Sequence, residues 1–133
     1  MIRAAAAALL LSAAASPAMA TEWIDCADPD MNASVSLLVG ALDVLAVVAA
    51  KLDVGDSHWV SDPVYGEGDG TMLLAVGQAF EDAETIRVDL MDDGMSEKLA
   101  ELRLFKAEDG DTVVYSGTLR SPGRGAWAVS CGP

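Results

Sequence analysis

The chain has 133 residues and carries 21 acidic residues against eight Lys and Arg, which gives a formal net charge of −13. A field of this sign repels nucleic acid and anionic membrane surfaces, so the composition argues against both as partners. The length suits one domain built around one hydrophobic core.

Residues 1–20 have the pattern of a secretory signal peptide. Arg3 supplies a positive start, residues 4–15 are rich in Ala and Leu, and residues 17–20 end in a small-residue cleavage pattern, with the cut expected between Ala20 and Thr21. The alternative is a membrane anchor, but the apolar run is shorter than the roughly 20 residues that a span requires. Cleavage removes Arg3 and no acidic residue, so residues 21–133 carry a net charge of −14. We therefore expect a periplasmic or secreted protein that makes no membrane contact after cleavage.

The chain contains two cysteines, Cys26 and Cys131, close to the two ends of the expected mature protein. In an oxidising compartment such a pair is expected to form a disulfide. Closing a loop of about a hundred residues stabilises the fold by about 4–5 kcal/mol in the chain-entropy model. The spacing does not match a redox Cys-x-x-Cys motif, and two cysteines with one histidine make a poor zinc site.

The first half of the chain predicts short strands. Residues 21–33 suggest a first strand or an ordered arm held by the disulfide. Residues 34–52 are almost wholly apolar and allow two interpretations, a buried helix or a hairpin that turns at residues 40–43; the β-branched residues favour the hairpin. Residues 52–60 suggest a more polar strand with a break at Gly55-Asp56. The glycines and proline of residues 61–70 indicate a surface loop.

The second half alternates apolar and polar residues between turn signals. Strands are predicted at residues 71–80 and 85–90, with a turn at 91–95. Residues 99–107, 113–119 and 126–131 then predict three consecutive antiparallel strands joined by Asp-Gly and Pro-Gly turns. About eight short strands at this spacing indicate an all-β fold, a small antiparallel sandwich or barrel in a single domain.

The residues that could carry catalysis are few. His58 is the single histidine and no serine lies in a Gly-x-Ser-x-Gly elbow, so we expect a non-enzymatic protein without a cofactor. Acidic pairs fall beside glycines at residues 67–70, 92–94 and 108–111, but none matches the twelve-residue calcium loop. Hairpin turns account for these pairs, and no metal site is predicted, with calcium at one of the turns left as the alternative.

The composition suggests two kinds of binding site. An acidic surface suits a basic protein partner, although solubility alone also explains it. The candidate residues for such contacts are the turn carboxylates Asp62, Glu67, Asp69, Asp92, Asp93, Glu108 and Asp109. The alternative is a barrel with an apolar mouth for a small ligand, lined by Trp59, Tyr65 and Phe80.

In outline the chain resembles small exported lysozyme inhibitors, which share a signal peptide, about a hundred residues of antiparallel strands, terminal cysteines and an acidic surface. This resemblance implies a lysozyme as one candidate partner. Those families insert a Ser-Gly-x-x-Tyr type loop into the lysozyme cleft, and this chain has no such stretch. Its nearest segment, Tyr115-Ser-Gly117, has the reverse order. No functional residue is therefore carried over from the resemblance.

Overall fold

The computed structural model describes residues 21–132, so the predicted signal peptide lies outside the described residues. Residues 21–132 form nine strands and one short 3₁₀ turn, η1 (Pro63–Tyr65). The strands are β1 (Thr21–Ala27), β2 (Ala33–Gly40), β3 (Ala46–Val54), β4 (Ser57–Val60), β5 (Met72–Glu81), β6 (Thr85–Asp92), β7 (Lys98–Asp109), β8 (Thr112–Ser121) and β9 (Gly125–Gly132).

The strands close into one barrel in which each strand pairs with its neighbours in the sequence and β9 pairs with β1. This confirms the predicted all-β fold as a barrel. One expectation was wrong, because the pairing is not antiparallel throughout: β4 and β5 are parallel, with Trp59 opposite Met72 and Val60 opposite Leu73. Residues 61–71 make this possible because they carry the chain back to the same end of the barrel before β5 begins.

The ambiguous segment, residues 34–52, lies in a hairpin made by β2 and β3, which confirms the favoured interpretation. Its inward residues Leu37 and Leu52 are fully buried in the core. Two outward residues that pair with each other, Leu38 and Ala49, are also buried. A strand that is covered on both faces loses the alternation of polar and apolar residues, so the sequence here resembles a buried helix.

The interior of the barrel is filled by alternate residues of all the long strands. β6, β7, β8 and β9 contribute large apolar side chains that are almost inaccessible to solvent, among them Ile86, Val88, Leu102, Leu104, Leu119 and Val129. The three predicted C-terminal strands are present and consecutive, as β7, β8 and β9. Burial of this apolar set is the main stabilising contribution to the fold.

The barrel closes between β1 and β9 over three residue pairs, and the central pair is Cys26 with Cys131. These two residues form the predicted disulfide across 105 residues of sequence. The disulfide is consistent with an oxidising, extracytoplasmic environment. It also means that the shortest antiparallel ladder of the barrel is covalently held.

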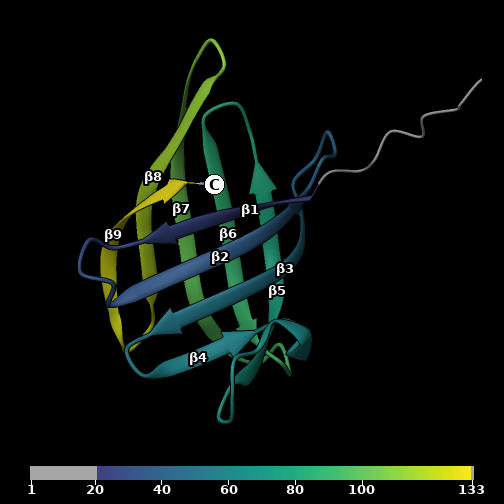
Figure 1. Ribbon diagram of the computed structural model, residues 1–133, viewed down its shortest axis with the longest axis vertical. Helices are drawn as coiled ribbons and strands as arrows, with labels where there is room; N and C mark the ends of the chain where they lie inside the picture. Colours follow the sequence, from purple (N-terminus) through teal and green to yellow (C-terminus); the bar gives the residue numbers. More distant parts are fainter. Residues whose placement is uncertain (1–20, 133) are drawn as a thin grey trace, which may run out of the picture.

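Figure 1 shows how the two ends of the barrel differ. β1, β2 and β3 run across the front, and β5 to β8 run behind them in a crosswise direction. The β5–β6 and β7–β8 hairpins project at one end, drawn at the top, and β4 with residues 61–71 lies at the other. Within the described residues, no helix has the length and apolar character needed to cross a membrane.

Candidate functional site

Seven carboxylate residues lie in or beside the two hairpins that project at one end of the barrel (Figure 1). We call this the hairpin end and define it by seven carboxylate residues, Glu22, Glu81, Asp82, Glu84, Glu108, Asp109 and Asp111. Lys106 joins the two hairpins, because its Nζ lies 3.6 Å from Glu81 and 3.8 Å from Glu108. Its backbone N–H also donates to the carbonyl of Glu84. Lys106 and Arg87, whose charge acts on Asp82, are therefore two cations beside seven carboxylates.

Tyr115 marks the mouth of the barrel at this end. With Glu22, Asp111 and Val113 it lines a hollow of about 290 Å³. Burial raises the pKa of the Tyr115 hydroxyl, and the nearby carboxylates of Glu81, Glu22 and Glu108 raise it further, while Lys106 lowers it. Three carboxylates and one lysine therefore lie close enough to Tyr115 to act on its hydroxyl.

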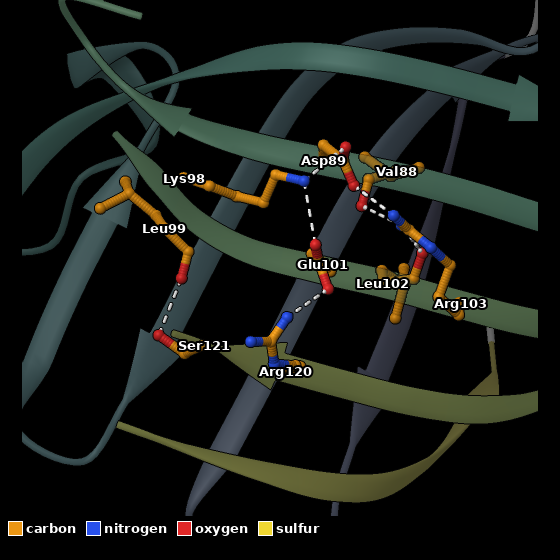
Figure 2. A network of polar contacts seen from close by, with 9 residues as sticks. All are labelled: Val88, Asp89, Lys98, Leu99, Glu101, Leu102, Arg103, Arg120 and Ser121. Atoms are coloured by element: carbon orange, nitrogen blue, oxygen red, sulfur yellow. Dashed lines mark hydrogen bonds and ion pairs between the residues drawn. The ribbon is translucent and has the colours of Figure 1, made fainter. Parts of the chain in front are cut away.

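Three of the seven basic residues in residues 21–132 are engaged elsewhere, on the outer face of β6, β7 and β8 (Figure 2). Lys98 lies 3.2 Å from Asp89 and 2.9 Å from Glu101. Arg103 contacts Asp89 at 2.7 Å, and Arg120 contacts Glu101 at 3.0 Å. This network, which we call the waist network, places three cations against two carboxylates. These three cations therefore do not neutralise carboxylates at the hairpin end.

The pKa values of the waist network reflect this pairing. Burial raises the pKa of Asp89, but hydrogen bonds from Arg103 and Lys98 outweigh it, so the net shift is downward. Hydrogen bonds from Lys98 and Arg120 lower the pKa of Glu101, and the same contacts with Glu101 and Asp89 raise the pKa of Lys98. All three groups are therefore held in their charged forms.

Large apolar side chains are exposed close to the acidic hairpins. Phe105 on β7 is 71% exposed, Val114 on β8 is 55% exposed and Phe80 on β5 is 50% exposed. Phe105 pairs with Thr85, the first residue of β6 after the turn of the β5–β6 hairpin. Apolar side chains surrounded by charged ones resemble the composition of a protein-binding surface, where aromatic anchors lie within a polar rim.

The predicted partner-binding carboxylates are split between the two ends of the barrel. Glu108 and Asp109 lie at the hairpin end, while Asp62, Glu67, Asp69, Asp92 and Asp93 lie in turns at the opposite end (Figure 1). Two of the latter organise their own turns. Asp62 accepts a hydrogen bond from the Val64 N–H at the start of η1, and Asp92 accepts from the N–H groups of Ser96 and Glu97. Backbone N–H groups, with that of Glu97 the largest contribution, lower the pKa of Asp92.

The predicted ligand-lining residues do not surround one mouth. Trp59 is buried among the core residues, and it and Tyr65 line a hollow of about 290 Å³ against β2, β3 and β4. We call this hollow the outer groove. Phe80 lines a different hollow on the outer face of β5, β6 and β7, together with Arg87 and Arg103.

Sequence reasoning missed the polar floor of the outer groove, which is formed by Ser36, Lys51 and Asp53. Ser36 pairs with Lys51 and Ser34 pairs with Asp53 across β2 and β3. A signal for this patch was present, because the polar residues of 34–52 occur at alternate positions near its two ends. That these residues share one face can be predicted only when the register of the β2–β3 hairpin is known.

His58 pairs with Asp53 through Nδ1 at 2.5 Å, and Asp53 also accepts a hydrogen bond from the Ser34 hydroxyl at 3.3 Å. Nucleophilic catalysis requires the hydroxyl to bond the imidazole, with the carboxylate behind it. Here the carboxylate stands between the hydroxyl and the imidazole, so the trio is not arranged as a catalytic triad. Among residues 21–132, no three His, Cys, Asp or Glu side chains are grouped in a way that could hold a metal ion.

Comparison of the chain with protein-family models, with curated protein sequences and with solved structures returned no match. The hairpin end and the outer groove are therefore the features from which binding partners are inferred.

Proposed function

We propose that this protein is an exported, non-enzymatic binding domain that docks a basic protein partner on its hairpin end. The observation that carries the proposal is the grouping of seven carboxylates with exposed apolar side chains on and beside the two projecting hairpins. Seven carboxylates share the hairpin end with Lys106, whereas Lys98, Arg103 and Arg120 are paired in the waist network. Concentrating like charge at one end costs folding stability, so solubility alone gives no reason for it.

The exposed apolar residues support the same proposal. Charge complementarity steers a partner and sets specificity, while buried aromatic anchors supply most of the binding energy. Phe105 and Val114 are exposed within reach of the acidic hairpins and are suited to the anchoring role. A partner with a basic rim around an apolar pocket fits this combination of residues.

Titration calorimetry against two basic probes, egg-white lysozyme and cytochrome c, tests the proposal. We expect binding at about 20 mM NaCl that weakens at least about tenfold at about 150 mM, because the interacting charges are exposed and screened. A parallel assay of lysozyme activity tests the inhibitor resemblance separately. Absence of binding to both probes at low salt would remove this function.

Two matched triple variants locate the binding surface. Glu108→Gln with Asp109→Asn and Asp111→Asn removes three charges at the hairpin end. Glu67→Gln with Asp69→Asn and Asp93→Asn removes three charges at the opposite end. The first triple should weaken binding about tenfold and the second about twofold or less, since charge attraction falls with distance and screening. Equal losses would indicate attraction to net charge instead of to a defined surface.

A further inference from the structure

The outer groove is built by a loop that folds back over the strands. Ser61 fixes the root of the loop, because its N–H donates to the carbonyl of Ala50 and its hydroxyl accepts from the Ala50 N–H, both at 2.9 Å. Farther along, the Tyr65 ring meets the edge of Trp23 on β1, with 5.4 Å between the ring centroids. The loop is thus held at two points, and the hollow of about 290 Å³ lies between it and the strands.

The groove gathers charges of both signs from separate elements. Lys51 and Asp53 come from β3, His58 from β4 and Glu67 from the loop. Asp53 is already engaged by Ser34 and His58. Lys51 takes part in no ion pair within residues 21–132, and its Nζ lies 5.2 Å from the centre of the Trp23 ring instead. In a chain with so many carboxylates, a lysine that rests on an aromatic ring is positioned to receive an outside anion.

The charge of the whole protein limits which anion can arrive. A net charge of −14 on residues 21–133 repels a free anion, whereas a ligand with no net charge is not repelled. The groove offers an ammonium at Lys51, a carboxylate at Glu67 and aromatic surface at Tyr65, whose ring packs against Trp23 outside the groove lining. A ligand that matches all three has a carboxylate, an amine and an apolar body.

We propose that the outer groove binds a small zwitterion of the α-amino-acid class. Lys51 receives the ligand carboxylate, Glu67 receives the ligand ammonium, and the Tyr65 ring packs against the ligand side chain. This site goes beyond the proposed partner binding, because its residues are separate from those that define the hairpin end, and either function can exist without the other.

Protein-observed NMR with L-leucine as the probe tests the site, with L-leucinamide and N-acetyl-L-leucine as partial ligands. We expect saturable shifts confined to the groove residues and a Kd of about 1 mM or tighter for L-leucine. Each partial ligand should bind about tenfold more weakly, because each lacks one charged group and leaves Lys51 or Glu67 without a partner. Equal affinity for all three compounds, or no shifts at the groove, would overturn the proposal.

Matched variants test which protein side chain binds each charged group of the ligand. Lys51→Gln should weaken L-leucine about tenfold and leave L-leucinamide unchanged, while Glu67→Gln should weaken L-leucine and leave N-acetyl-L-leucine unchanged. Arg87→Gln, which removes a cation from the outer face of β6, and Glu84→Gln, which removes a carboxylate from the hairpin end, are the controls and should bind like the wild type. Unfolding midpoints of all four variants establish that they fold. A loss caused by the controls as large as that caused by the groove variants would also contradict the site.

Discussion

At the scale of single residues, Gly117 shows how closely two strands of the barrel approach each other. It lies within β8 opposite Leu104 of β7. A Cβ atom at this position would overlap the carbonyl oxygen of Arg103, and this atom belongs to the backbone and cannot rotate away. Glycine is therefore required here for space, and its conformational freedom is not the reason.

We expect Gly117→Ala to destabilise the protein by more than about 2 kcal/mol, because the β7–β8 ladder must shift to accept the methyl group. Gly132→Ala is the matched control, since nothing lies within 4 Å of a Cβ at that position. Urea unfolding of both variants measures the difference. A Gly117→Ala protein as stable as the Gly132→Ala protein would contradict the close approach of β7 and β8.

Asp89 is the residue on which the waist network depends, because it receives both Lys98 and Arg103 (Figure 2). We expect Asp89→Asn to destabilise the fold by about 1 kcal/mol at neutral pH, a value reduced for the partial exposure of both cations. Asp93→Asn, in an exposed turn, is the control and should have little effect. Denaturant unfolding at pH 7 makes the comparison.

The cost of Asp89→Asn should also depend on pH. The pKa of Asp89 is lowered in the folded protein relative to its ordinary value of 3.8. Its contribution to stability is therefore present above pH 3.8 and is lost as the pH falls through the lower, folded-state pKa. We expect the wild type and Asp89→Asn to converge in stability as the pH is lowered below 3.8. A difference that stayed constant down to pH 2 would show that the carboxylate charge is not what stabilises the network.

At the scale of elements, the antiparallel ladder of the barrel is shortest where β1 meets β9. Three residue pairs join these strands, whereas β7 and β8 pair over nine. The disulfide between Cys26 and Cys131 compensates for this short ladder by tying the two strands together. The connection matters most in the unfolded chain, where it restricts a loop of about a hundred residues.

We expect the Cys26→Ala, Cys131→Ala double variant to lose about 3–5 kcal/mol of unfolding free energy. Urea unfolding measures the loss, and reduction of the wild type should reproduce it. Hydrogen exchange should then accelerate first in β1 and β9, since only the short ladder would join these two strands to each other. Unchanged protection of β1 and β9 in the double variant would show that the ladder alone is sufficient.

At the scale of the whole molecule, the proposed binding depends on the distribution of charge more than on the net charge. Lys98, Arg103 and Arg120 are paired in the waist network, Lys51 lies over Trp23 and Arg124 over Trp59, and Lys106 contacts Glu81 and Glu108 at the hairpin end. The carboxylates of the hairpin end are left to repel one another. The free protein therefore stores repulsion that a basic partner would relieve.

This distribution predicts opposite effects of salt on folding and on binding. Raising NaCl from about 10 to about 300 mM should increase the urea midpoint of the free protein, because screening weakens the repulsion among carboxylates. The same change should weaken the complex with a basic probe. The Glu108→Gln, Asp109→Asn, Asp111→Asn variant should show a smaller increase in midpoint than the wild type. A midpoint that fell with salt would mean that the ion pairs outweigh the repulsion.

The sequence by itself was enough to predict most strands, the turns between them and the disulfide. The signals are local: alternation in residues 99–107 and 126–131 shows which face is buried, and Asp-Gly or Pro-Gly steps show where the chain reverses. Cys26 and Cys131 had no alternative partners. In the apolar segment at 34–52 the β-branched residues favoured a hairpin over a buried helix, and the pairing of β2 with β3 decides between them.

Tertiary structure decided the closure of the barrel, the parallel pairing of β4 with β5 and the places where functional groups meet. Trp59 and Tyr65 were predicted to share a site and do line one hollow, but Phe80 lies elsewhere and Lys51 was missed. The turn carboxylates were predicted individually, and their division between two ends follows from the strand order around the barrel. These features depend on register and on contacts between residues far apart in the chain, and such contacts form only when the whole barrel buries its core.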